Sequence, residues 1–205
     1  MAGQTKPRAS IEGGGVFLLQ VREEMREMER QGLVIVHTGD GKGKTTAALG
    51  LALRAWGSGL RVLILQFIKG GQRYGELDTI KALKGVRDTI EVRQCGLGFT
   101  RRDEKRKEEH IAAAKEAVRE AEQEIISGVW DLIILDEINY AVKFGLLETK
   151  DVLRLVKEKP QELHLVLTGR DAAPELIDAA DLVTEMKLVK HPFQKGIKAQ
   201  LGIEF

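Results

Sequence analysis

The strongest constraint on the fold is a strand, a glycine-rich loop and a helix that follow one another directly between residues 33 and 53. Residues 33–37 read LVIVH, the loop at 38–46 reads TGDGKGKTT, and residues 47–53 are apolar and favour a helix. Glycines allow consecutive backbone N–H groups to point inward, and the start of the next helix adds unpaired donors and the positive end of its dipole. Phosphate groups bind at such a point, so this order predicts a phosphate-binding loop in an α/β fold.

The loop departs slightly from the usual phosphate-loop motif GxxxxGK[ST]. Thr38 stands where that motif begins with glycine, so three residues separate the outer glycines, Gly39 and Gly43. A ligand-free turn is the alternative, but the flanking strand and helix favour a phosphate site. Lys44 supplies a positive charge, and the Thr45 hydroxyl is a suitable Mg²⁺ ligand. The residues predicted to bind the phosphates are Gly39, Asp40, Gly41, Lys42, Gly43, Lys44, Thr45 and Thr46.

A second pattern associated with nucleotide binding is WDLIILDE at 130–137, an apolar strand that ends in Asp136 and Glu137. Successive strand residues point in different directions, so one carboxylate faces a metal ion, directly or through water, and the other faces substrate or a structural donor. The sequence leaves open which carboxylate does which. A strand ending in solvated acids is the better interpretation of this segment alone. Beside a phosphate loop, we predict a Mg²⁺ site formed by Thr45, Asp136 and Glu137.

Short apolar runs alternate with helical patterns along the rest of the chain. The clearest predicted helix, 103–127, carries apolar residues at helical spacing from Ile111 to Ile125 and leaves His110 on its exposed face. Strands alternating with such helices predict an α/β fold, with a mostly parallel sheet covered by helices on both faces, as in P-loop NTPases of RecA-like architecture. The predicted strands are 33–37, 61–67, 90–95, 131–136, 164–168 and 182–188.

The predicted domain organisation has three parts. Residues 1–15 are polar and glycine-rich and are expected to form a flexible tail, and residues 16–32 show the spacing of an amphipathic helix. Residues 33–205 are expected to form a single P-loop α/β domain, since a chain of 205 residues leaves little room for a second one.

Composition narrows the classes of partner. Lys and Arg number 32 and Asp and Glu 31, so the formal charge of +1 favours a small-molecule partner over nucleic acid or an acidic membrane surface. The single cysteine, Cys95, cannot form an internal disulfide, and no apolar run approaches the length of a membrane span. We therefore expect a cytoplasmic protein that binds neither nucleic acid nor membrane.

Five segments together resemble the P-loop corrinoid adenosyltransferases. They are TGDGKGKTTAA at the phosphate loop, QFIKG at 66–70, GLGFT at 96–100, LDEINY at 135–140 and KHPFQKGIKAQLGIEF at 190–205. The resemblance implies transfer of the 5′-deoxyadenosyl group of ATP to the cobalt of a reduced cob(I) corrinoid, with release of triphosphate. It also implies a homodimer, Mg²⁺, and a reduced flavoprotein or other electron donor. ATP would lie reversed relative to ordinary P-loop NTPases, with its ribose 5′ carbon toward the corrinoid.

The chemistry implied by this resemblance needs few catalytic groups. A cob(I) nucleophile requires no general base, and Lys44 with Lys42 and the loop amides would neutralise the leaving triphosphate. None of the four histidines lies in an Asp-x-His-x-x-Gly motif, so cobalt ligation by histidine is not indicated. Phe99 is the candidate for the apolar side chain that displaces the lower cobalt ligand. The chain has Arg101 where many family members have tryptophan, so Phe99 acts alone, another residue substitutes, or the corrinoid has no lower nucleotide ligand.

Further residues are candidates for contacts with the nucleotide. Arg54 and Arg170 are placed where a guanidinium can bind phosphate oxygens, with solvated arginines as the alternative. Lys190 and His191, in the C-terminal motif, are candidates for contact with adenine or ribose. Lys69 follows the second predicted strand and either faces the site or is a solvated loop charge. The competing function is a P-loop ATPase or nucleotide switch that acts on a protein or nucleic acid partner.

Overall fold

A computed structural model describes residues 31–71, 73–98 and 106–204. The chain divides into two units, Met1–Gln31 and Gly32–Phe205, and the second contains the elements described below. The expectations for the tail, for nearly all of the helix at 16–32, and for Phe99 and Arg101 concern positions outside the described residues.

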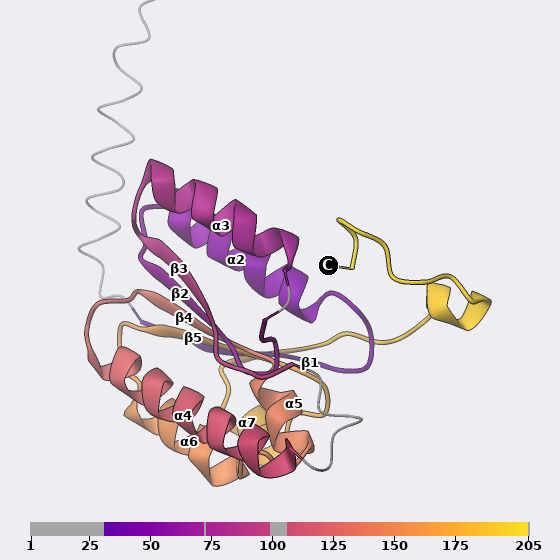
Figure 1. Cartoon of the computed structure of the whole chain (residues 1–205). Helices are drawn as coiled ribbons and strands as arrows, with labels where there is room; N and C mark the ends of the chain where they lie inside the picture. The colour runs from indigo at the N-terminus through magenta and orange to yellow at the C-terminus, as the bar shows by residue number, and fades with distance from the viewer. Residues whose placement is uncertain (1–30, 72, 99–105, 205) are drawn as a thin grey trace, which may run out of the picture. The chain divides into compact units, whose positions relative to one another are not determined.

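The core of the second unit is a six-stranded sheet in the order β3-β2-β4-β5-β1-β6, in which every neighbouring pair is parallel. The predicted α/β fold with a parallel sheet is confirmed (Figure 1). The strands are β1 Val34–Thr38, β2 Val62–Gln66, β3 Ile90–Gln94, β4 Leu132–Asp136, β5 His164–Thr168 and β6 Leu182–Glu185.

Helices cover both faces of the sheet, as predicted (Figure 1). Helices α2 (Lys44–Gly57) and α3 (Gly75–Val86) lie on one face, and α4 (Lys107–Ile126) and α6 (Thr149–Glu158) lie on the other. The shorter helices α5 (Ile138–Lys143) and α7 (Pro174–Asp178) join the second layer, and a 3₁₀ helix, η2, spans Pro192–Lys195. None of the helices in the described ranges is long and apolar enough to cross a membrane.

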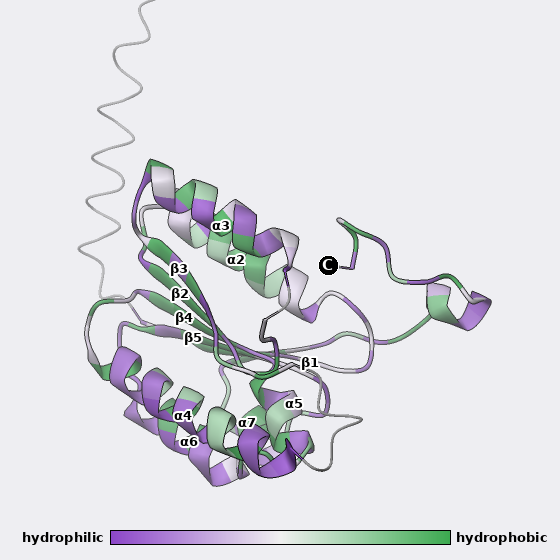
Figure 2. Cartoon of the chain, in the orientation of Figure 1, coloured by the Kyte–Doolittle hydropathy of each residue, from purple (hydrophilic) through white to green (hydrophobic). Residues whose placement is uncertain are grey.

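Strand alternation explains why both faces can be covered. In β2, Val62 and Ile64 belong to the apolar cluster with α2 and α3, whereas Leu63 and Leu65 belong to the cluster with α4 to α7. Strands buried on both faces must be apolar at nearly every position, which produces the continuous runs seen in the sequence. Figure 2 shows these strands in green, with hydrophilic residues gathered on the helices.

The structure corrects two sequence expectations. His110 is buried, not exposed, because the inward face of α4 runs through His110, Ala114, Ala121 and Ile125. The last strand ends at Glu185 and not at residue 188. Beyond Glu185, Met186 N still donates to the carbonyl of Thr38 at the end of β1, but the Met186 carbonyl accepts from Gly41 in the loop that follows.

Candidate functional site

The phosphate loop joins β1 to α2 at the carboxyl edge of the sheet, where ligands bind in open α/β folds. Gly43 caps α2 with a φ of 109°, and Lys44 begins the helix. The Lys44 side chain folds back under the loop, and its Nζ donates to the carbonyl oxygens of Gly39 and Gly41, each at 2.6 Å. Burial lowers the pKa of Lys44, because the charged form loses water. The predicted strand, loop and helix are thus all present, with a buried lysine inside the loop.

The chain after β6 packs directly against this loop. Met186 N donates to the Thr38 carbonyl at 2.8 Å, and Gly41 N donates to the Met186 carbonyl at 2.6 Å. A Cβ atom on Gly39 or Gly41 would lie 2.6 Å from the Met186 oxygen. These glycines are therefore needed for chain packing as well as for any contact with phosphate. Sequence reasoning did not detect this role, because it depends on which strand lies beside β1.

Asp136, at the end of β4, is buried and fully surrounded by donors. Its Oδ1 accepts hydrogen bonds from the hydroxyls of Thr45 and Thr168, both at 2.8 Å. Its Oδ2 lies 3.3 Å from Lys69 Nζ and accepts from Gln66 Nε2 at 3.5 Å. This carboxylate therefore joins the ends of β2, β4 and β5 to the first turn of α2.

Glu137 has a different environment from its neighbour. Its φ of 64° lies in the left-handed region that non-glycine residues rarely adopt, and its N–H donates to the Thr168 hydroxyl at 2.9 Å. Among the described residues, its carboxylate has no hydrogen-bond or ion-pair partner. Burial, together with the negative charge of Asp136, raises the pKa of Glu137 to about 6. Asp136 is thus surrounded by donors in this structure, whereas the carboxylate of Glu137 has no partner among the described residues.

The donor set at this edge fits a magnesium ion. Thr45, Asp136 and Glu137 all provide oxygen, the ligand atom that Mg²⁺ prefers, and two of the three are carboxylates. No group of three or more His, Cys, Asp or Glu side chains in the described part of the chain could hold a metal by itself. Mg²⁺ commonly takes its remaining ligands from substrate phosphates and water, so a small protein contribution is what such a site requires.

Two more of the predicted residues lie at the loop. Arg170 follows β5, and its Nη1 lies 3.6 Å from Asp40 Oδ1, which brings this guanidinium to the phosphate loop. Lys42 is paired with Glu204, near the end of the chain. This pairing places the C-terminal segment against the loop, in addition to the contacts of Met186.

Other predicted residues lie elsewhere or are exposed. Thr46 is exposed on α2, and Arg54 is exposed in the last turn of α2. Arg54 lies ten positions after Lys44, a rise of about 15 Å along a helix, so the structure does not bring Arg54 to the loop. Lys190 is exposed beyond β6, and His191 Nδ1 accepts from Phe193 N at 3.1 Å, which caps η2.

Sequence reasoning missed two residues that complete the site. Thr168 ends β5 and bonds both to Asp136 and to the backbone of Glu137, because β5 lies between β1 and β4. Glu76, on α3, accepts from Lys69 Nζ at 2.9 Å. A hydroxyl at the carboxyl end of a buried strand was the available signal for Thr168. No sequence signal marked Glu76.

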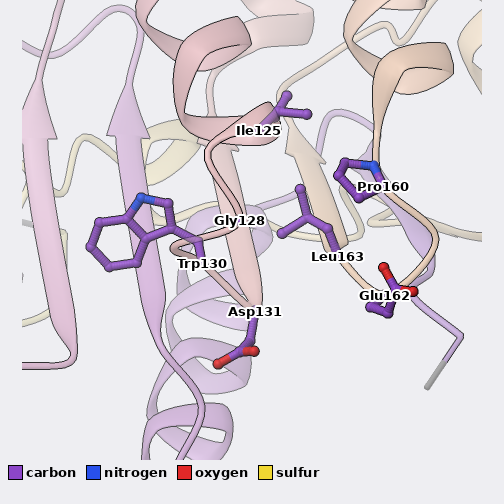
Figure 3. A pocket seen from close by; sticks show the side chains of 7 residues that line it. All are labelled: Ile125, Gly128, Trp130, Asp131, Pro160, Glu162 and Leu163. Atoms are coloured by element: carbon purple, nitrogen blue, oxygen red, sulfur yellow. The ribbon is translucent and has the colours of Figure 1, made fainter. Parts of the chain in front are cut away.

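A hollow of about 130 Å³ lies at the opposite edge of the sheet, where the strands begin. It is lined by Trp130 and Asp131 before β4 and by Glu162 and Leu163 before β5 (Figure 3). Its lining contains two carboxylates and neither lysine nor arginine. Such a lining repels phosphate, so this hollow is not suited to bind the triphosphate.

Comparisons with known proteins found corrinoid adenosyltransferases among the relatives of this chain. A corrinoid adenosyltransferase from a Sinorhizobium species is 43% identical over 178 residues, which are 86% of this chain and 82% of that protein. A corrinoid adenosyltransferase from Pseudomonas aeruginosa is 42% identical over 177 residues, 86% of this chain and 85% of that one. Among solved structures, a KaiC-like protein from Pyrococcus horikoshii aligns over 78% of this chain and 74% of its own, with 12% identity and a TM-score of 0.45.

The model of the family described as ATP:corrinoid adenosyltransferase BtuR/CobO/CobP matches residues 30–205. This match includes the phosphate loop, both carboxylates at the end of β4 and the segment after β6. The chain therefore belongs to the ATP:corrinoid adenosyltransferase family.

Proposed function

We propose that this protein transfers the 5′-deoxyadenosyl group of ATP to the cobalt of a reduced cob(I) corrinoid and releases inorganic triphosphate. The observation that carries the proposal is the family match over residues 30–205, which includes every described element of the site. The buried Lys44 inside the phosphate loop supports it, since the triphosphate must be held and its charge neutralised.

In the proposed reaction, the electron pair of cob(I) forms the cobalt–carbon bond to C5′. The bond between C5′ and the triphosphate oxygen breaks, and its electron pair leaves with the triphosphate. No proton is removed before attack, so the site needs no general base. The chain must therefore orient C5′ toward cobalt and stabilise the charge that develops on the leaving group.

Lys44 is the principal residue for the leaving group. Its ammonium is buried beside two loop carbonyls, and transfer of these hydrogen bonds to phosphate oxygens would place a positive charge beside the triphosphate. Arg170 lies beside Asp40 of the loop and Lys42 belongs to the loop, and both would add positive charge. Amides of Gly39, Gly43 and their neighbours are proposed to contribute hydrogen bonds.

We propose that Thr45, Asp136 and Glu137 hold Mg²⁺ with the nucleotide. When bound, Mg²⁺ draws electron density from the departing triphosphate and so makes it a better leaving group. Asp136 holds the Thr45 hydroxyl at 2.8 Å and fixes its orientation, whereas the unpaired carboxylate of Glu137 is the one available to the metal or to its water. We propose this division of roles between the two carboxylates, whose roles the sequence left open.

The remaining assignments also belong to the proposal. Phe99 is proposed as the apolar side chain beneath the corrinoid, and Lys190 and His191 as contacts for adenine or ribose. A reduced flavoprotein or other donor is proposed to supply the electron that reduces the corrinoid to cob(I). The protein is proposed to be a homodimer in the cytoplasm. The near-neutral charge of +1 supports a small-molecule substrate without nucleic acid or membrane.

The test is an anaerobic reaction of the pure protein with MgATP and chemically reduced cob(I)alamin or cobinamide. The corrinoid spectrum and the phosphate product are followed together. Adenosylcorrinoid and triphosphate in equal amounts are the expected result. Accumulation of ADP and phosphate, with no change of the corrinoid, would instead support an ATPase or nucleotide switch.

A further inference from the structure

Lys69 lies beside the proposed metal site but belongs to neither the phosphate loop nor the strand-end carboxylates. Its Nζ lies 3.3 Å from Asp136 Oδ2 and 2.9 Å from Glu76 Oε1. It also lies 4.7 Å from the centre of the Tyr74 ring, and its side chain is only 15% exposed. The alternative of a solvated loop charge does not describe this lysine.

The backbone around Lys69 fixes the ammonium in this place. Phe67 N donates to the Asp136 carbonyl at 2.9 Å, and Gly96 N donates to the Lys69 carbonyl at 3.2 Å. Gly70 comes so close to the next loop that a Cβ atom there would lie 1.8 Å from the Gly96 oxygen. The loop after β2 is thus held between β4 and the loop after β3.

Lys69 provides the positive charge for Asp136. The two groups on Oδ1 are hydroxyls, and the second group on Oδ2 is the Gln66 amide, all of them neutral. Within the described ranges, Lys69 is the only cationic side chain at ion-pair distance from Asp136. A buried carboxylate is costly without a partner charge, so this ion pair stabilises the ligand-free site.

A cation at this position affects free metal and metal–nucleotide differently. A free divalent ion that approaches Asp136 meets a positive charge already paired with the same carboxylate, and is repelled. A metal–ATP complex has a net negative charge, because the triphosphate outweighs the metal. That complex attracts the same ammonium, which can exchange Asp136 for a phosphate oxygen while it keeps Glu76.

We propose that Lys69 is a resident counter-cation of Asp136 that makes the site selective for the metal–nucleotide complex over the free divalent ion. The inference rests on the metal and nucleotide site of the proposed function, and it adds a selectivity residue to that site. Glu76 is the positioning residue, since its carboxylate holds the ammonium when Lys69 changes partner.

The test compares binding of free Mn²⁺ and of Mn²⁺–ATP, measured by electron paramagnetic resonance without corrinoid. Lys69→Met is expected to bind free Mn²⁺ at least about fivefold more tightly than the unmodified chain. It is expected to bind Mn²⁺–ATP no more tightly. Lys81→Met, on the exposed side of α3, is the matched control.

A second pair of variants tests the same inference in case Lys69→Met does not fold. Lys69→Gln retains a donor for Glu76 without the charge, and it is expected to shift free Mn²⁺ affinity in the same direction. Glu76→Gln leaves Asp136 as the only carboxylate of the described residues at ion-pair distance from Lys69, so free Mn²⁺ binding is expected to weaken. Melting temperatures verify that each variant is folded.

Free Mn²⁺ affinities of both Lys69 variants within twofold of Lys81→Met, or weaker, would overturn the inference. Because no corrinoid is present, this outcome is separate from the fate of the proposed function. A protein that makes no adenosylcorrinoid but shows the Mn²⁺ shift would retain the selectivity role. If the protein makes adenosylcorrinoid but the Lys69 variants do not change its affinity for free Mn²⁺, the selectivity role of Lys69 is refuted and the proposed function stands.

Discussion

The Thr45 hydroxyl donates to Asp136 Oδ1 at 2.8 Å and so connects the first turn of α2, which follows β1, to the end of β4, although β5 lies between β1 and β4 in the sheet. Thr168, at the end of that strand, donates to the same oxygen. One carboxylate oxygen thus fixes the relative positions of three neighbouring elements at the site.

Replacement of Thr45 by valine should weaken both the fold and the reaction. Valine has nearly the same volume but no hydroxyl, so Asp136 loses one donor, at a cost on the order of 1.5 kcal/mol in the free energy of unfolding. Urea titration measures this change, and Thr45→Ser should restore most of it. The exposed Thr46→Val is the matched control for the urea titration, and an equal loss of stability at both positions would contradict the structural role given to Thr45.

Replacement of Lys44 by alanine should reduce adenosyl transfer by more than about tenfold, because the leaving triphosphate loses its buried positive charge. The initial rate of adenosylcorrinoid formation, at saturating and at low ATP, separates catalysis from binding. Near-normal turnover by Lys44→Ala, relative to the exposed Lys81→Ala, would refute the role.

Replacement of Glu137 by glutamine should stabilise the protein in the absence of metal and nucleotide, to an extent that depends on pH. The pKa of this carboxyl is raised from 4.5 to about 6, so the folded state favours its protonated form. Ionisation therefore costs stability progressively between pH 4.5 and about 6, reaching about 2 kcal/mol above that range.

The gain from Glu137→Gln should be small at pH 4.5 and full at pH 7.5, as measured by urea unfolding at both values. Glu158→Gln, at an exposed position of α6, is the control for exchange of a carboxylate for an amide. A gain that is equal at the two pH values would show that charge burial at Glu137 is not its cause.

Replacement of Gly41 by alanine should destabilise the protein by about 1–3 kcal/mol, because its Cβ would lie 2.6 Å from the Met186 carbonyl oxygen. Gly50→Ala is a sharp control. Gly50 lies within α2 with open space around it, so alanine there should stabilise the protein by about 0.5–1 kcal/mol. Thermal unfolding distinguishes the two, and a stabilised Gly41→Ala would disprove the close packing of loop and C-terminal segment.

The sequence was sufficient to predict the sheet and the phosphate loop, because buried parallel strands and glycine-rich loops have strong local patterns. Five of the six strands were predicted to within one residue at either end. The predicted end of β6 was wrong because the actual end depends on distant residues. Met186 donates to Thr38 at the end of β1 and accepts from Gly41 in the loop after it. The prediction that His110 is exposed was wrong, because the buried face of α4 begins one turn before Ala114. Histidine is not a hydrophobic residue, so the apolar pattern does not include it.

The candidate site was predictable in its residue types but not in its connections. The sequence motifs identify Lys44, Thr45, Asp136 and Glu137. The difference in hydrogen-bond partners between the two carboxylates depends on which strands are neighbours. Thr168 reaches Asp136 only because β5 is inserted between β1 and β4. Such information is held in the strand order, and a single sequence does not reveal it.

The hydrogen bond from Gly41 to Met186 joins positions 145 residues apart, so during synthesis it can form only after residue 186 has been added to the chain. A ribosome that has made β1, the loop and α2 has not yet made the segment that holds the loop in shape. Contacts so distant in sequence close late and slowly. A nascent chain should therefore acquire ATP binding only after residue 186 has left the exit tunnel, and shorter chains released early should remain without it.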